Sequence, residues 1–129
     1  MKKQTLAIHT AYPSKDAYGA LSMPVYHAAA YDFDNAADMA DAFCGRVTAP
    51  DYSRVMNPTV MNLENRVKAL TGAQAVVALN SGMAAISNTL LALASAGKNI
   101  VSSRHMFGNT YSLITETGTR FGVESYASV

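Results

Sequence analysis

The sequence has no tryptophan and only one cysteine, Cys44, so an internal disulfide is excluded. A lone cysteine is typical of a reducing compartment, where thiols stay free. The chain also lacks an apolar run of about 18 residues, the shortest that indicates a membrane-spanning helix. Residues 1–9 are too polar for the apolar core of a signal peptide. Together these absences predict a cytoplasmic protein with no membrane partner.

Charge of either sign is scarce as well. Acidic and basic side chains make up 15% of the 129 residues, and the formal net charge is +1. This balance gives no electrostatic reason to expect binding to nucleic acid or to anionic lipid. The three histidines lack metal-ligand spacing, so no metal site is expected. Walker, G-x-S-x-G and G-x-G-x-x-G motifs are all absent.

Methionine and small apolar residues are, by contrast, abundant. Apolar residues make up 50% of the chain and include seven methionines, which suits closely packed helices or surfaces that meet a partner. The length allows one domain. An ordinary alanine-rich domain without a special site is an open alternative at this point.

The first half of the chain is predicted to be mostly irregular, with two helices. Residues 1–31 show no sustained hydrophobic period. A short helix is expected over Ala36–Cys44, after a cap at Asp34-Asn35 and before a stop at Gly45. A longer helix is expected to begin at the Asn-Pro pair of Asn57 and to end before Gly72, because Asn caps helices and Pro suits the first helical position.

The second half alternates between short apolar runs and helical patterns. Apolar runs of this kind suit strands that a parallel sheet buries on both faces. Alternation of strand and helix at this spacing predicts a parallel α/β fold with right-handed crossovers. The expected elements are strands over Gln74–Leu79, Asn99–Ser102 and Gly122–Tyr126, and helices over Ser81–Ser95 and Asn109–Thr117.

Tyr52 and Arg54 are the first candidates for anion binding. A guanidinium offers a planar, two-pronged donor, and a phenol two positions earlier lies on the same face of an extended segment. The alternative is a surface arginine paired with Asp51. The pattern by itself does not decide between a phosphate role and this structural role.

Ser81, Gly82 and Met83 are the second group of candidates. They lie where a predicted strand ends and a predicted helix begins, which is where open α/β sheets bind ligands. Free N–H groups and the helix dipole favour an anion there, and a glycine lets it approach the backbone. The alternative is that Ser81 acts only as an N-cap.

Phe107 is the last candidate. It follows the strand predicted over Asn99–Ser102, so it is expected at the same sheet edge as Ser81. An aromatic side chain there can cover the face of a planar cofactor ring. The alternative is an ordinary core aromatic.

Taken in order, these motifs resemble the N-terminal third of the pyridoxal-phosphate enzymes of cysteine and methionine metabolism. That family includes O-acetylhomoserine sulfhydrylase, methionine γ-lyase and cystathionine γ-synthase. The Y-S-R-x-x-N-P-T stretch joined to S-G-M-A-A is highly specific, and the similarity covers almost the whole chain. The similar stretches are residues 23–26, 52–59, 63–64, 80–85, 100–103 and 107–111.

The resemblance implies an α/β fold, namely the incomplete N-terminal portion of a fold type I large domain, which is aspartate-aminotransferase-like. It also implies a division of the chain. Residues 1–57 would form an extended segment with a short helix that makes intersubunit contacts, and residues 58–129 would form the first part of the cofactor-binding domain. In the family, later strands lie between the first two, so we expect Gln74–Leu79 to have open edges, and the isolated chain to be poorly stable or to associate.

The same resemblance implies that pyridoxal 5'-phosphate is the cofactor and assigns residues to it. Ser81, Gly82 and Met83 would hold the cofactor phosphate through the backbone. Tyr52 and Arg54 would reach the phosphate of a neighbouring subunit. Phe107 would stack on the cofactor ring where many members have tyrosine, and it lacks the hydroxyl that could assist proton transfer.

The activity implied is that of O-acetylhomoserine sulfhydrylase, which replaces acetate at Cγ by sulfide or methanethiol. Methionine γ-lyase and cystathionine γ-synthase are alternatives within the family, and an inert truncated module that binds partner chains is an alternative outside enzymology. No catalytic residue is expected in this chain, because the lysine that holds the cofactor covalently lies later in relatives. The chain alone is therefore predicted to be inactive. The expected partners are an amino-acid substrate and either identical subunits, as a dimer of dimers, or a complementing C-terminal polypeptide.

Overall fold

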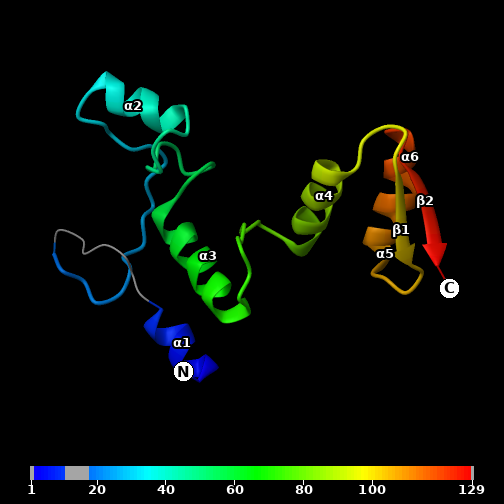
Figure 1. Cartoon of the computed structure of the whole chain (residues 1–129), viewed down its shortest axis with the longest axis horizontal. Coiled ribbons are helices and arrows are strands. Elements are labelled where there is room, and N and C mark those ends of the chain that lie inside the picture. The colour runs from blue at the N-terminus through cyan, green and yellow to red at the C-terminus, as the bar shows by residue number, and fades with distance from the viewer. Residues whose placement is uncertain (1, 11–17, 129) are drawn as a thin grey trace. The chain divides into compact units, whose positions relative to one another are not determined.

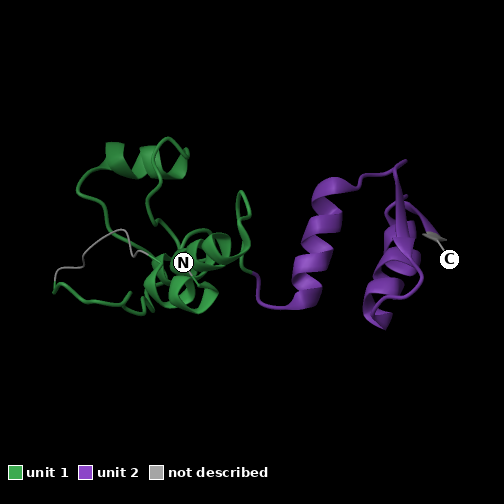
Figure 2. Ribbon diagram, turned by 60° about the horizontal axis from the view of Figure 1, so that its bottom comes forward, with its two compact units in different colours: residues 1–78 green, residues 79–129 purple. Residues whose placement is uncertain are grey.

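The computed structural model describes residues 2–10 and 18–128 and divides the chain into two compact units. Unit 1 is Met1–Ala78 and unit 2 is Leu79–Val129, as Figure 2 shows by colour. Unit 1 contains α1 (Lys3–His9), α2 (Ala36–Phe43) and α3 (Pro58–Thr71). Unit 2 contains α4 (Gly82–Leu93), β1 (Asn99–Ser103), α5 (Gly108–Ser112), the π-helical η1 (Leu113–Thr117), α6 (Gly118–Arg120) and β2 (Glu124–Ser128).

The two helices predicted in the first half of the chain are confirmed, and both begin at the expected cap. The Asn35 side chain accepts hydrogen bonds from two N–H groups of the first turn of α2, and Asn57 does the same for α3. Pro58 occupies the start of α3, where its missing N–H costs no hydrogen bond. Gly72 ends α3 in the left-handed conformation, at φ 73°, which glycine adopts without steric cost.

Helix α1 was not predicted, because its sequence has no sustained apolar period. In the structure α1 lies against α3 (Figure 1), and the Arg66 guanidinium donates a hydrogen bond of 3.0 Å to the carbonyl oxygen of Ala7. A helix of seven residues is too short to be stable alone in water. The contact with α3 therefore explains why the helix forms.

The strand predicted over Gln74–Leu79 is wrong. These residues form no strand in the part of the chain that the structure describes, and the Val77 side chain is 75% exposed. Their backbone is held instead by Glu64, whose Oε1 accepts from the N–H of Ala78 at 2.7 Å. A strand needs a neighbour for its backbone groups, and no described segment pairs with this one. The segment therefore leaves apolar side chains exposed, and Leu79 is exposed as well as Val77.

Unit 2 is a parallel α/β arrangement, as predicted. β1 pairs with β2 in parallel, with Ile100 opposite Ser125 and Val101 opposite Tyr126. The helix expected over Asn109–Thr117 is present and longer, because α5, η1 and α6 follow one another without a break (Figure 1). Ile114 and Val123 are the buried apolar side chains among the described residues, so the small core lies between this helix and the start of β2.

The turn into β2 depends on a glycine. Gly122 has φ 73° and its carbonyl oxygen accepts a 2.8 Å hydrogen bond from the N–H of Gly97. A Cβ at this position would lie 3.3 Å from the Cβ of Ala96, so a side chain would be both strained and crowded. This close approach joins the loop after α4 to the end of α6.

One face of the two-stranded sheet has no cover within unit 2. Side chains alternate between the faces of a strand, and Ile100 lines an apolar groove shared with α4 and the following helix. Its neighbour Val101 is 69% exposed, and Tyr126 on β2 is 54% exposed.

None of the helices within residues 2–10 and 18–128 has the length and apolarity needed to cross a membrane.

Candidate functional site

Tyr52 and Arg54 lie in a tight turn of unit 1. The carbonyl oxygen of Tyr52 accepts from the N–H of Val55 at 2.8 Å and from that of Met56 at 2.9 Å. The extended conformation predicted for this segment is therefore wrong, because the chain reverses direction at residues 52–55. The two side chains still meet, since the Arg54 Cζ is 5.2 Å from the centroid of the Tyr52 ring. We call residues 52–55 the Tyr52 turn.

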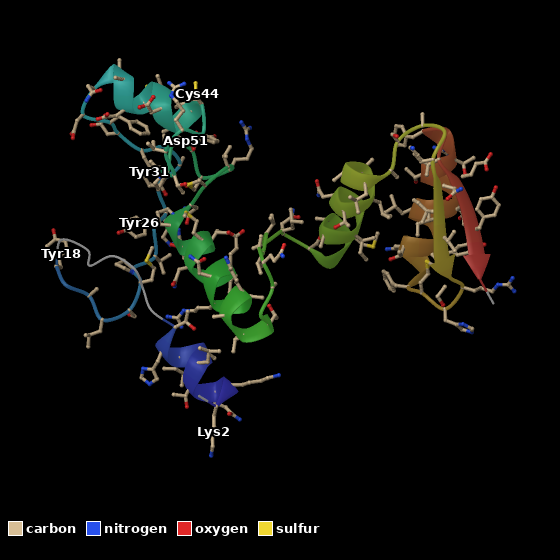
Figure 3. The ribbon with its side chains drawn as sticks, in the orientation of Figure 1. Lys2, Tyr18, Tyr26, Tyr31, Cys44 and Asp51 are labelled. Carbon is tan, nitrogen blue, oxygen red and sulfur yellow. The ribbon has the colours of Figure 1, made fainter. Side chains whose placement is uncertain are left out.

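A short antiparallel pairing holds the Tyr52 turn against the segment before α2. Tyr52 forms a bridge with Ala30, the N–H of Ser53 donates to Ala29 at 2.9 Å, and the N–H of Tyr31 donates to Asp51 at 3.2 Å. Figure 3 shows Tyr31 and Asp51 close together near the start of α3. The turn therefore has a backbone support that local sequence does not indicate.

The alternative role considered for Arg54, an ion pair with Asp51, is not present. Asp51 Oδ1 accepts instead from the N–H of its neighbour Tyr52 at 2.6 Å. Within the described residues the one ion pair joins Arg46 to Asp41, at 2.6 Å. Arg54 is exposed and touches the face of Tyr52, and its guanidinium donors remain available to an anion.

The start of α4 carries the second group of candidates, in unit 2. The Ser81 side chain accepts from the N–H of Ala84 at 3.0 Å, so its predicted role as N-cap is confirmed. No described group accepts a hydrogen bond from the N–H of Gly82 or of Met83. A Cβ built on Gly82 would meet no atom within 4 Å, so the space beside its Cα is open. Two N–H groups without an acceptor at a helix start suit a phosphate.

The cap at Ser81 gives a testable prediction. We expect Ser81→Ala to destabilise unit 2 by about 1 kcal/mol, because the N–H of Ala84 loses its acceptor. Urea unfolding followed by circular dichroism would measure the loss. Ser95→Ala is the matched control, because the exposed Ser95 lies beyond the end of α4 and is not its cap. Equal stability of the two variants would contradict the role of the cap.

Phe107 stands at the start of α5 and is 67% exposed, so its alternative as a core aromatic is wrong. Its carbonyl oxygen accepts from the N–H of Thr110 at 2.9 Å. The hydroxyl of Thr110 in turn contacts the sulfur of Met83 at 3.7 Å. The first turns of α4 and α5 are thus adjacent. The shared sheet edge predicted for them is wrong, because the strand predicted before Ser81 is absent from the described sheet.

The candidate residues therefore form two separate groups. Tyr52 and Arg54 are in contact within unit 1, and Ser81, Gly82 and Met83 lie near the start of α5 within unit 2. Sequence reasoning missed two residues of the first group, Ser53 and Asn57, whose side chains support the Tyr52 turn. The pair of Asn57 and Pro58 indicated only a helix start. No local signal showed that the Asn57 side chain also donates a hydrogen bond to Ser53.

Tyr126, whose pKa is shifted, belongs to neither group of candidate residues. The pKa of Tyr126 is raised, because its hydroxyl donates to Glu124 at 2.7 Å and the carboxylate disfavours a second negative charge. Both residues are exposed on β2. In the chain as described, no group of three or more His, Cys, Asp and Glu side chains is placed to hold a metal ion.

Comparison with known proteins assigns these features to a family. The model of the Cys/Met metabolism PLP-dependent enzymes matches residues 4–128. An L-methionine gamma-lyase of Fusobacterium nucleatum is 40% identical over 127 residues. That match covers 96% of this chain and 32% of the lyase, so the chain spans about a third of the length of that relative.

Two solved structures match as well. A Campylobacter jejuni protein named as an O-acetylhomoserine (thiol)-lyase superposes with a TM-score of 0.91 at 36% identity, over 98% of this chain and 31% of that chain. It carries a pyridoxyl-lysine monophosphate at its position 205. The O-acetylhomoserine sulfhydrylase of Wolinella succinogenes is 51% identical over 56% of this chain and 20% of its own, with a TM-score of 0.54. The predicted α/β fold, the N-terminal portion of a fold type I large domain, is confirmed.

Proposed function

The chain belongs to the Cys/Met metabolism PLP-dependent enzyme family, and we propose that it supplies the cofactor-phosphate site of an enzyme acting on sulfur amino acids. The observation that carries this proposal is the start of α4. The amides of Gly82 and Met83 have no acceptor among the described residues, and they stand where the family resemblance implies a phosphate. The donors present fit a phosphate monoester.

In this proposal each residue at the start of α4 has a distinct part. Gly82 and Met83 donate their N–H groups to the phosphate of pyridoxal 5'-phosphate, and the dipole of α4 favours its charge. Ser81 keeps the first turn in place through its hydrogen bond to Ala84. When bound, pyridoxal phosphate supplies the electron sink that stabilises a carbanion of the substrate.

Tyr52, Arg54 and Phe107 complete the proposed cofactor site. Arg54 offers a guanidinium without a carboxylate partner, supported on the ring of Tyr52, and we propose that both reach the phosphate held by a neighbouring subunit. Phe107, exposed at the start of α5, is proposed to cover the face of the pyridine ring. Its lack of a hydroxyl leaves it no part in proton transfer.

The proposed activity is that of O-acetylhomoserine sulfhydrylase, with acetate at Cγ replaced by sulfide or methanethiol. The 51% identity to the Wolinella sulfhydrylase supports this choice. Methionine γ-lyase is the second candidate, favoured by the 40% identity to the Fusobacterium protein. Assays with O-acetylhomoserine plus sulfide, and with methionine alone, on an assembly that includes residues 1–129 would separate them.

The remaining proposals concern the surroundings of the site. We propose a cytoplasmic enzyme whose subunits associate, because the proposed role of the Tyr52 turn needs the phosphate of a neighbouring subunit. The family resemblance implies a homotetramer. A complementing C-terminal polypeptide is an alternative source of the missing parts. If the chain meets neither a complementing polypeptide nor catalytically complete subunits, we propose that it is a module that binds partner chains without catalysis.

Covalent trapping tests where the cofactor lysine resides. We expect no specific borohydride-reducible bond between pyridoxal 5'-phosphate and purified 1–129. The lysines that the structure describes, Lys2, Lys3, Lys68 and Lys98, are all exposed, and none lies in α4 or in the turn before α5. Mass spectrometry after reduction would locate any adduct.

Pyridoxal without its phosphate is the control, because surface lysines react with both aldehydes at low occupancy. Stoichiometric, phosphate-dependent labelling of one lysine would show that this chain holds the cofactor covalently by itself. Turnover of O-acetylhomoserine by the purified chain would contradict the proposal in the same way.

A further inference from the structure

The Asn57 side chain contacts both α3 and the Tyr52 turn. Its Oδ1 accepts from the N–H of Thr59 at 2.9 Å, which caps α3. Its Nδ2 lies 2.9 Å from Ser53 Oγ and 3.0 Å from the carbonyl oxygen of Tyr26. The oxygen of this amide therefore caps α3, and its nitrogen donates hydrogen bonds to the Tyr52 turn and to the segment that contains Tyr26.

Ser53 is the residue through which Asn57 reaches the turn. The Ser53 hydroxyl donates its single proton to the carbonyl oxygen of Ala28, so it acts as an acceptor for Asn57 Nδ2. The hydroxyl of Tyr31, 3.2 Å away, must then be the donor in its contact with Ser53. Figure 3 shows Tyr26 and Tyr31 along the segment beside the start of α3. The group of side chains joins two parts of the chain that are far apart in sequence, residues 26–31 and residues 53–59.

The side chains that would touch a phosphate have no comparable anchor. Tyr52 and Arg54 are both exposed, whereas Ser53 between them is half-buried. Besides the contact between Tyr52 and Arg54 themselves, the turn is held by backbone hydrogen bonds, by the Asp51 carboxylate at the N–H of Tyr52, and by Ser53. The half-buried Ser53 therefore helps to fix the positions of the exposed Tyr52 and Arg54.

We propose that Asn57 is a positioning residue for phosphate binding, acting through the hydrogen bond from its amide nitrogen to Ser53. Tyr52 and Arg54 keep their places because Ser53 is fixed between Asn57 and Ala28. This inference rests on the proposed phosphate role of Arg54, and it adds a residue that the cofactor does not touch. Helix capping by Asn57 is a separate role of the other end of the same side chain.

Two substitutions separate the roles of the amide. Asn57→Asp keeps the shape and the capping oxygen but removes the donor, and Asn57→Ser keeps a capping oxygen without adding charge. Asn35 offers matched controls, Asn35→Asp and Asn35→Ser. Its Oδ1 caps α2 in the same way, at 2.9 Å from the N–H of Ala37, and its Nδ2 contacts only the nearby Asp38 among described residues.

The test measures amide hydrogen exchange and pyridoxal 5'-phosphate affinity on the full chain of each variant. We expect both Asn57 variants to exchange the amides of Val55 and Met56 about tenfold faster and to bind the cofactor about tenfold more weakly. Protection within α3 should stay near the wild-type level, which shows that the cap and the fold persist. Both Asn35 variants should behave as wild type in the turn.

Two results would overturn the positioning role. One is wild-type exchange at Val55 and Met56 in Asn57→Ser. The other is a loosened turn in Asn57→Asp alone, since that would indicate an effect of the added charge. Failure of the proposed function gives a different pattern: wild type and Arg54→Ala would bind the cofactor equally, while exchange in the turn would still decide the role of Asn57.

Discussion

Replacing Arg54 by alanine is expected to weaken the binding of pyridoxal 5'-phosphate by about 10- to 100-fold, the loss that follows from removing a hydrogen bond to a charged group. Arg54 is exposed, stands against the ring of Tyr52, and has no ion pair in the described chain, so its charge is free for an anion. Titration of the purified chain with the cofactor, followed by its absorbance, would measure the change.

Arg46 is the matched control for this prediction. It is also exposed and belongs to unit 1, but its Nε donates to Asp41 Oδ1 at 2.6 Å, so its charge is already paired. We expect Arg46→Ala to bind the cofactor as wild type does. Pyridoxal lacking its phosphate should be insensitive to Arg54→Ala. An equal loss in both arginine variants would indicate general attraction of an anion and would contradict a specific site.

The features that sequence predicted correctly are those decided within a few residues. The caps at Asn35, Asn57 and Ser81 each use a side-chain oxygen and an N–H two or three positions later. Such contacts need no knowledge of the rest of the fold, because the side chain and the helix start meet wherever the helix forms. The parallel arrangement of β1 and β2, whose paired residues are 25 positions apart, was predicted instead from the alternation of strand and helix along the chain.

The features that sequence missed depend on segments far apart in the chain. Helix α1 needs the contact from Arg66 to Ala7, and the shape of the Tyr52 turn needs the pairing of Tyr52 with Ala30. The apolar run at Gln74–Leu79 has the composition of a buried strand, yet composition cannot supply the neighbour that a strand requires. The hydrogen bond from the Asn57 side chain to the carbonyl oxygen of Tyr26 was missed for the same reason, since the two residues lie 31 positions apart.

The location of the two halves of the phosphate site gives the prediction with the sharpest outcome. If Arg54 reaches a phosphate held by Gly82 of another subunit, two variants that each bind the cofactor poorly should restore binding when they are mixed. Gly82→Val is suited to this test, because a Cβ at this position meets no atom within 4 Å. We expect the added side chain to hinder the close approach of a phosphate to the backbone. We expect Gly82→Val and Arg54→Ala each to bind the cofactor at least about tenfold more weakly than wild type when studied alone.

A mixture of the two variants should then recover binding. In a mixed dimer, one site takes Arg54 from the Gly82→Val subunit and the free amides from the Arg54→Ala subunit, whereas the other site carries both defects. Random exchange of subunits should restore about a quarter of the wild-type sites, because half of the dimers are mixed and each contains one intact site. The number of bound cofactors per chain, measured after co-refolding, decides the question. A mixture that binds no more than its components would mean that each site is formed by one chain, since each chain then carries one defect in its own site and subunit exchange cannot repair it.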